Sequence, residues 1–335
     1  MTTFWFIVIT VLWTGFLVLE GFDFGVGALH GLVGGDEDGR RAVIHTIAPV
    51  WDGNEVWLIV AGASMFAAFP GWYATAFSGL YLALVLLLVV LILRGVGIEF
   101  RHKRDSARWR RLWSVALIAS SLVAPLLVGV ALADFGYGLP IDADQEFVGT
   151  FWDLLPLYSI VTGLAFVAIT LLHGAVFLGI KVHGEPHRRA TRIARVVAPA
   201  AAVLVFAMVI WTHVAVGHGF LLTLVELAAL VAIVAAVWLV LVGSWGWAFV
   251  ATALTIASMV LTIFTNLYPN VMVSSLDPAN NLTIHNTASA QYSLTVMTVI
   301  VAIFLPGVIA YQAWTYHVLR RRLTEPASAT QSTTQ

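Results

Sequence analysis

The sequence has no cysteine among its 335 residues. That absence excludes disulfides, thiolate-ligated zinc or copper, and cysteine-held iron–sulfur clusters within the chain. Charged residues are also scarce, at 10% of the chain, compared with about 25% in an ordinary soluble domain. The formal net charge of -1 is too small to favour nucleic acid or another polyanion as a partner.

Apolar residues are what the chain has in excess, at 60% of the sequence. A run of about 20 apolar residues is long enough to cross the hydrocarbon core of a bilayer. The first such run begins within MTTFWFIVIT and lacks both a basic preceding segment and a small-residue cleavage site. We therefore expect an all-α, polytopic membrane protein whose first run is a membrane span and not a cleaved signal.

About nine transmembrane helices can be counted along the chain, and they suggest two four-helix bundles, spans 2–5 and 6–9, plus one extra helix. Short connections at residues 69–72 and 243–246 leave an eight-span count open, in which two runs are fused or one is dropped. The expected spans are residues 4–33, 53–70, 72–98, 112–134, 155–181, 194–217, 219–242, 246–268 and 291–318.

The basic residues predict the orientation of these spans. With nine spans, every Lys and Arg lies on the side of the C-terminus or, for Arg94, near that end of span 3, while the opposite side holds acidic residues such as Asp134 and Asp277. The positive-inside rule then places the N-terminus outside and the C-terminus in the cytoplasm. We expect residues 1–323 to form a single integral membrane domain and the polar tail 324–335 to be disordered.

Two acidic residues interrupt the first span within LEGFDFGVGALHG, residues 19–31. Glu20 and Asp23 are three residues apart and share a helix face, and acids inside a membrane usually line a polar path. The alternative is a packing helix whose acids reach water at its cytoplasmic end. Two Gly-x-x-x-Gly pairs would let a neighbouring helix approach closely. These pairs are Gly21 with Gly25 and Gly27 with Gly31.

The second span begins within APVWDGNEVWL, residues 48–58. Asp52 fits a helix N-terminal cap, but capping explains neither Glu55 one turn deeper nor Asn54 between them. Four carboxylates at one membrane depth suit a proton-conducting entrance, because desolvation and mutual repulsion favour proton uptake. The predicted proton-path residues are Glu20, Asp23, Asp52 and Glu55, and the predicted structural residues of the motif are Trp51, Gly53, Asn54 and Trp57.

Other polar residues near the spans are weaker candidates. Glu226 interrupts span 7, while His285 and Asn286 belong to a polar run before span 9 that is either a solvated cap or part of a ligand site. A membrane histidine such as His173 or His213 is either a hydrogen-bonded packing residue or an axial haem ligand. No pair of histidines at two-haem spacing favours the second interpretation, and we predict no metal site in this chain.

Four blocks of sequence resemble the signature blocks of subunit II of cytochrome bd-type quinol oxidases, in the same order and across nearly the whole chain. The block WDGNEVW is highly specific for that family, and Glu20 stands where many relatives have Asp, which keeps the carboxylate. The blocks are EGFDFGVG at 20–27, APVWDGNEVWL at 48–58, FAAFPGWYATAFSGLY at 66–81 and LTIHNTASAQYSLTVM at 282–297.

The resemblance implies a terminal oxidase that oxidises quinol, reduces O2 to water and takes up protons from the cytoplasm. It implies a larger partner, subunit I, that carries two b-type haems and one d-type haem, so that this chain ligates no cofactor itself and is inactive alone. A structural quinone, quinol, lipids and a small single-helix accessory subunit are further partners that it allows. The expected location is the bacterial cytoplasmic membrane.

The resemblance also assigns roles to single residues. Asp23 and Asp52 match family acids assigned to a proton path, and Glu20 occupies a neighbouring acidic position. Two alternatives from other classes remain open, namely a proton-coupled secondary transporter and a membrane subunit that itself binds a b-type haem. A transporter usually shows broken helices in two related halves, and this sequence shows none clearly.

Overall fold

The computed structural model describes residues 1–215 and 219–318. The expected tail 324–335, together with the last basic residues that enter the orientation argument, Arg320 to Arg322, lies outside this range. Eight of the described helices are long and apolar enough to cross a membrane. They are α1 (Thr2–Gly34), α5 (Tyr81–Phe100), α6 (Ala107–Tyr137), α7 (Leu157–Lys181), α8 (Gly184–Ala215), α9 (Phe220–Val242), α10 (Trp245–Leu267) and α11 (Gln291–Val318).

Three shorter helices, α2 (Glu37–His45), α3 (Trp51–Ala68) and α4 (Pro70–Gly79), join α1 to α5. The second expected span corresponds to α3. Polar residues in its first turn make α3 less apolar than the eight long helices, so it is not one of them. The third expected span, residues 72–98, is wrong as a single helix. It is divided between α4 and α5, because the backbone leaves the helical conformation at Leu80 (φ -90°, ψ 14°).

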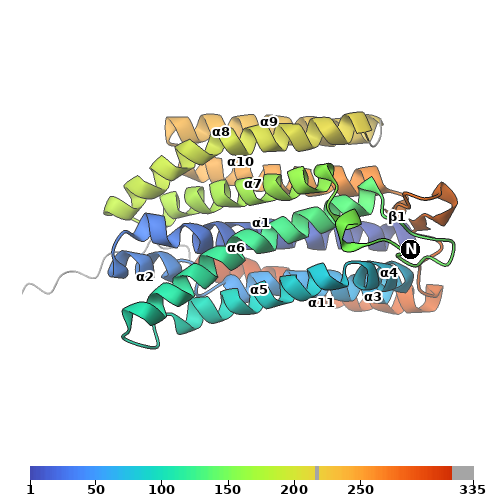
Figure 1. Cartoon of the computed structure of the whole chain (residues 1–335), viewed down its shortest axis with the longest axis horizontal. Helices are drawn as coiled ribbons and strands as arrows, with labels where there is room; N and C mark the ends of the chain where they lie inside the picture. Colours follow the sequence, from blue (N-terminus) through green and yellow to red (C-terminus); the bar gives the residue numbers. More distant parts are fainter. Residues whose placement is uncertain (216–218, 319–335) are drawn as a thin grey trace, which may run out of the picture.

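Helix α1 lies at the centre of the molecule, and the long helices run roughly along one axis (Figure 1). It packs against α3, α6, α7 and α10 and also contacts α2 and α8. Its residues from Glu20 to His30 are all buried. A helix that is enclosed on every side can hold polar groups away from lipid, and the acidic residues of span 1 lie on such a helix.

The all-helical class is confirmed, with a different grouping of helices from the one expected. Helices α7, α8, α9 and α10 pack on one another, and α1 and α6 pack on α7 as well as on α3 and α5 respectively. Helix α7 therefore belongs with the later helices and not with the earlier ones, and α1 and α6 join the two parts. Helix α11 has a single buried residue, Leu294, so most of its surface is left for lipid or a partner.

The glycines of α1 mark its closest helix contacts, as the Gly-x-x-x-Gly pairs predict. A Cβ atom on Gly25 would lie 2.7 Å from the Cα atom of Gly174 in α7 and would collide with the carbonyl oxygen of Thr170. Gly27 faces Ser121 of α6 in the same way. Glycine at these positions allows α1 to be packed tightly between two long helices.

Two loops at the opposite end from α2 fold against each other. Strands β1 (Asn270–Met272) and β2 (Leu282–Thr283) form a short antiparallel hairpin. The Oγ atom of Ser274 donates a hydrogen bond of 2.6 Å to the carbonyl of Ile141 in the other loop. Each loop is short, and their mutual hydrogen bonds supply the order that neither would have alone.

Candidate functional site

A buried ion pair joins α1 to α5 in the membrane-spanning part of the molecule. Arg94 of α5 and Glu20 of α1 form this pair, and neither side chain has any exposed surface. The Nη1 atom of Arg94 also lies 3.5 Å from Oε2 of Glu55 in α3, whose side chain is 22% exposed. The guanidinium lies over the ring of Phe24, 4.8 Å from its centroid. One arginine therefore connects carboxylates from two neighbouring helices.

Asn54 of α3 forms the second part of the same site. Its Nδ2 atom donates a hydrogen bond of 2.7 Å to Oδ2 of Asp23 in α1. Its Oδ1 atom accepts hydrogen bonds from Nε2 of Gln312, at 3.1 Å, and from the hydroxyl of Tyr316, at 2.7 Å. Both donors belong to α11. A single amide side chain thus links α1, α3 and α11 and fixes the orientation of the Asp23 carboxylate.

The charges of the site do not balance. Glu20, Asp23 and Glu55 supply three carboxylates, and within the described part of the chain Arg94 is the one cation that pairs with them. An ionised carboxylate buried without a counter-charge costs several kcal/mol, of the order of a broken buried ion pair. Proton binding removes that cost, so the arrangement is suited to taking up and releasing protons. We call these residues, with Asn54, the α1–α3–α5 cluster.

Asp52 lies outside the α1–α3–α5 cluster. Its side chain is exposed, and its Oδ1 atom accepts a hydrogen bond of 2.8 Å from the backbone N–H of Gly53. The reason is helical geometry: Asn54 faces α1, and a residue two positions earlier is rotated by about 200° about the helix axis. Of the two acids of the motif, Glu55 lies near Arg94, whereas Asp52 is exposed one turn earlier on α3.

The tryptophans of the motif pack against glycines of neighbouring helices. Atoms of the Trp57 ring lie 2.6 Å from where a Cβ on Gly15 would be, and Trp51 packs in the same way on Gly95 of α5. Gly53 has no neighbour within 4 Å of such a position. The two tryptophans pack α3 against α1 and α5.

Sequence reasoning missed three members of the site. Arg94, Gln312 and Tyr316 hold Glu20 and Asn54 in place. Arg94 carries a recognisable signal, because a lone arginine inside the apolar run LVLLLVVLILRGVG needs a carboxylate partner. Gln312 and Tyr316 lie more than 250 residues from Asn54, and no local pattern indicates that contact.

The weaker candidates are distributed elsewhere. Glu226 of α9 is nearly buried and its Oε2 atom lies 2.8 Å from Nδ1 of His213 in α8, which makes a separate polar pair. Asn286 accepts a hydrogen bond from the N–H of Thr283 and, like His285, is exposed in the loop before α11. These contacts are those of a turn, so the structure gives His285 and Asn286 no part in the α1–α3–α5 cluster.

His173 is packed on all sides. Its Nδ1 atom lies 2.7 Å from Oγ1 of Thr252, and its ring stacks on Phe249 with 4.3 Å between centroids. One turn along α1 from Gly21, the backbones of α1 and α7 are so close at Gly25 that a side chain larger than that of glycine would collide with α7. The close contact of α1 with α7 beside His173 favours the packing interpretation of this histidine. No group of three or more His, Cys, Asp or Glu residues that could hold a metal ion occurs among the described residues.

Comparison with known proteins agrees with this architecture. The chain matches the family described as cytochrome bd terminal oxidase subunit II over residues 1–319. It is 38% identical over 324 residues to cytochrome bd ubiquinol oxidase subunit 2 of Bacillus subtilis (strain 168), covering 96% of each chain. It is 34% identical over 359 residues to cytochrome bd-I ubiquinol oxidase subunit 2 of Escherichia coli (strain K12), covering 96% of this chain and 94% of that protein.

The fold also has a counterpart among solved structures. A chain of the bd oxidase from Geobacillus thermodenitrificans superposes with a TM-score of 0.75 at 18% sequence identity, covering 96% of this chain and 99% of that chain. At that identity the match supports the fold alone, whereas the family match and the two relatives extend over nearly the whole sequence. The chain belongs to the family of cytochrome bd terminal oxidase subunit II.

Proposed function

We propose that this chain is the haem-free subunit of a quinol-oxidising, O2-reducing oxidase, and that its α1–α3–α5 cluster carries protons from the cytoplasm toward a haem-bearing subunit I. The observation that carries the proposal is the excess of buried carboxylate over cation around Arg94. The haems of the partner would supply the redox chemistry. Membership of an oxidase family is the reason to prefer this function to a secondary transporter.

Each residue of the cluster would have a distinct part. Glu55 is partly exposed and its carboxylate lies 3.5 Å from Arg94, so it would exchange protons with the entrance. The Oδ1 atom of Asp23 is buried and has no hydrogen-bond partner among the described residues, which leaves it available to bind a proton. Arg94 would hold the Glu20 carboxylate in place through their ion pair, and Asn54 would keep Asp23 oriented by its 2.7 Å hydrogen bond.

The proposed subunit I would pack on the side formed by α3, α5 and α11. Asp52 is exposed on that side, and an exposed carboxylate facing lipid would be unfavourable. α11 is almost wholly unburied, as expected for a helix that a partner covers. In this arrangement Asp52 would lie at the subunit boundary, near the start of the proton path, with the N-terminus outside and the path opening to the cytoplasm.

Asp23→Asn tests the proton-carrying role. Asparagine has nearly the same shape and accepts the hydrogen bond from Asn54, but it cannot bind and release a proton at neutral pH. We expect O2 consumption by the purified complex with saturating quinol to fall by about 10²-fold or more, as for loss of a proton-transfer group, while haem content and yield stay near normal. Asp52→Asn should slow turnover less, because Asp52 is outside the buried cluster.

The matched control is Asp144→Asn, which makes the same change at an exposed loop position and should leave turnover unchanged. Normal turnover in Asp23→Asn with normal haem content would remove Asp23 from the proton path. A variant that loses haem and subunit I together would indicate an assembly role instead.

A further inference from the structure

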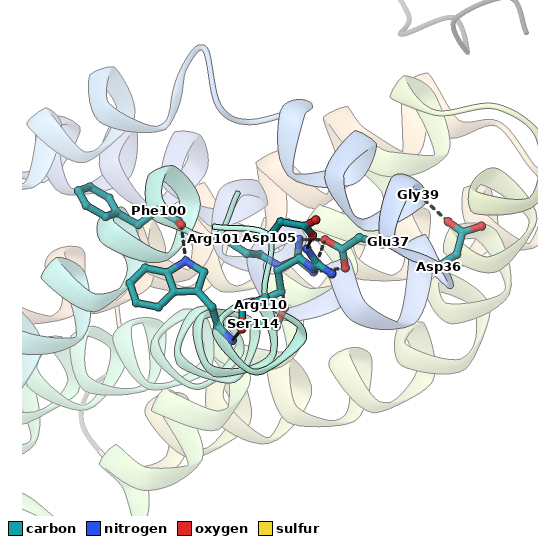
Figure 2. Close-up of polar contacts among 10 residues, drawn as sticks. Asp36, Glu37, Gly39, Phe100, Arg101, Asp105, Arg110 and Ser114 are labelled. Atoms are coloured by element: carbon teal, nitrogen blue, oxygen red, sulfur yellow. Dashed lines mark hydrogen bonds and ion pairs between the residues drawn. The ribbon is translucent and has the colours of Figure 1, made fainter. Parts of the chain in front are cut away.

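A pocket of about 370 Å³ lies at one end of the molecule, where α5 ends and α6 begins beside α2. It is separate from the α1–α3–α5 cluster. Figure 2 shows its central contacts, with Arg101 and Arg110 directed toward Glu37 and Ser114 below them on α6. Four arginines line the pocket, Arg40, Arg101, Arg110 and Arg111, together with one acid, Glu37.

Arg101 forms the fixed wall of the pocket. Its side chain is buried, and its Nη1 and Nη2 atoms donate hydrogen bonds of 2.6 and 2.9 Å to the two carboxylate oxygens of Glu37. Its Nε atom donates a 2.7 Å hydrogen bond to Oγ of Ser114. This two-pronged contact holds the guanidinium rigidly at the junction of α2, α5 and α6.

Positive charge remains in excess after these pairs are formed. Arg110 donates to Asp105 at 2.7 Å, and its Nε atom is 3.6 Å from Glu37. Within residues 1–215 and 219–318, no carboxylate forms an ion pair with Arg40 or Arg111, and the Nε atom of Arg40 is buried without a hydrogen-bond partner. A buried donor without an acceptor is unfavourable. A bound anion with several oxygens would satisfy it and balance the charge.

The surroundings of the pocket are those of a membrane boundary. Trp109 and Trp113, packed edge to face at 5.6 Å, lie on the first turns of α6, where interfacial tryptophans are common. Val115 lines the pocket and is 58% exposed, and Leu112 beside it is 61% exposed. An anion seated at Arg111 would thus have an apolar, outward-facing helix surface directly beside it.

We propose that this pocket binds the phosphate headgroup of an anionic phospholipid, with the acyl chains lying along α6 beside Leu112 and Val115. Clustered basic residues at the end of membrane spans attract such headgroups, and guanidinium groups suit phosphate oxygens in two-point contacts. A free phosphate ion has the same headgroup chemistry but makes no use of the exposed apolar surface next to the pocket.

The test uses the intact complex after delipidation in detergent. Phosphatidylglycerol is titrated into wild type and into the variant Arg40→Gln/Arg111→Gln, and bound lipid is counted by native mass spectrometry. Wild type should retain phosphatidylglycerol in preference to phosphatidylcholine. The double variant should bind one fewer phosphatidylglycerol, with affinity at that site reduced on the order of tenfold, as expected for removal of two basic groups.

The matched control is Arg108→Gln/Arg195→Gln, which removes the same charge from exposed positions outside the pocket and should bind lipid as wild type does. Equal lipid loss in both double variants would overturn the proposal, because it would indicate general surface charge. Inorganic phosphate is titrated in parallel, and phosphate that binds at the arginines and displaces no phosphatidylglycerol would assign the pocket to a free anion and overturn the lipid assignment.

A second measurement needs no variant. A photoreactive phosphatidylglycerol is added to the wild-type complex, and modified peptides are identified after irradiation. Labelling within residues 107–115 is expected, because Val115 and Leu112 border the proposed acyl chains. Labelling spread evenly over the exposed helices, with no enrichment in that segment, would contradict a specific site even if the double variant failed to assemble.

Discussion

The two sides of helix α1 bind their neighbours by opposite means. On the side toward α3 and α5, Glu20 and Asp23 form an ion pair and a hydrogen bond in a buried site. On the side toward α7, Gly25 and Gly174 bring two backbones together with no side chain between them. The charged side uses few, strong and directional contacts, and the glycine side uses close packing alone.

The difference between the two sides of α1 bears on why charged residues are buried on only one of them. Buried charge is unfavourable unless it has a purpose, and a well-packed apolar contact is often at least as stabilising as a buried ion pair. The side of α1 toward α7 demonstrates that this chain can pack helices without charge. This contrast supports the proton-carrying role proposed for the ionisable residues on the opposite side, and the variants below test that role.

Arg94→Gln is expected to have the largest effect. It leaves Glu20 and Glu55 buried without their cation, and loss of one partner of a buried pair typically costs about 3–5 kcal/mol. We expect a strongly reduced yield of assembled complex and a large fall in its thermal unfolding temperature in detergent. If the charge imbalance is the cause, Glu20→Gln/Arg94→Gln should be more stable than Arg94→Gln. A double variant that is less stable than either single variant would show that the pair acts through shape and not charge.

Gly25→Ala tests the other side of α1. The added methyl group would meet the backbone of Thr170 and Gly174, and such overpacking costs about 1–3 kcal/mol. We expect a moderate fall in unfolding temperature with O2 turnover per haem nearly unchanged. Gly246→Ala in α10 is the control, since nothing lies within 4 Å of the new methyl group. A loss of turnover in Gly25→Ala as large as that in Asp23→Asn would break the proposed division between the two sides.

The helices could be predicted from the sequence far better than their arrangement. Long apolar runs define α1, α7, α9, α10 and α11 within about two residues, because a membrane span has a required length. Helices α6 and α8 begin earlier than expected, α8 at Gly184 and not at residue 194, because their first turns are polar and basic and are not part of the apolar run. The break at Leu80 was not predicted, since the single Gly79 before it lies in a continuous apolar run where an isolated glycine is usually tolerated within a helix. The grouping of α7 with α8 to α10 depends on which helix faces meet, and apolar runs that are hydrophobic all round give no indication of that.

The candidate site was predicted in part. Glu20, Asp23, Asn54 and Glu55 were identified because polar groups are rare in such runs. The exposure of Asp52 could not be predicted, because the sequence does not say which residue of the motif faces α1. Gln312 and Tyr316 were missed because contacts between the first and last helices exist only in the folded chain.

The smallest expected effect concerns a carboxylate that is not buried. Asp153, in the short turn Phe151–Leu154, accepts hydrogen bonds from the N–H and hydroxyl of Thr150, and these bonds lower the pKa of Asp153 below its usual range. A lowered pKa means that the contact stabilises the fold above the unfolded-state pKa of about 3.9 and is lost as the pH falls through the folded-state pKa.

Asp153→Asn should therefore lower the unfolding temperature of the complex at pH 7 by less than Gly25→Ala does. The difference from wild type should disappear once the pH falls below the folded-state pKa, a condition best tested with the shortest possible exposure to acid. O2 turnover should be unchanged, because the carboxylate lies in water far from Arg94. If Asp153→Asn slowed turnover as Asp23→Asn is expected to do, loss of any carboxylate would impair the complex, and burial beside Arg94 would no longer explain why the acids of α1 matter.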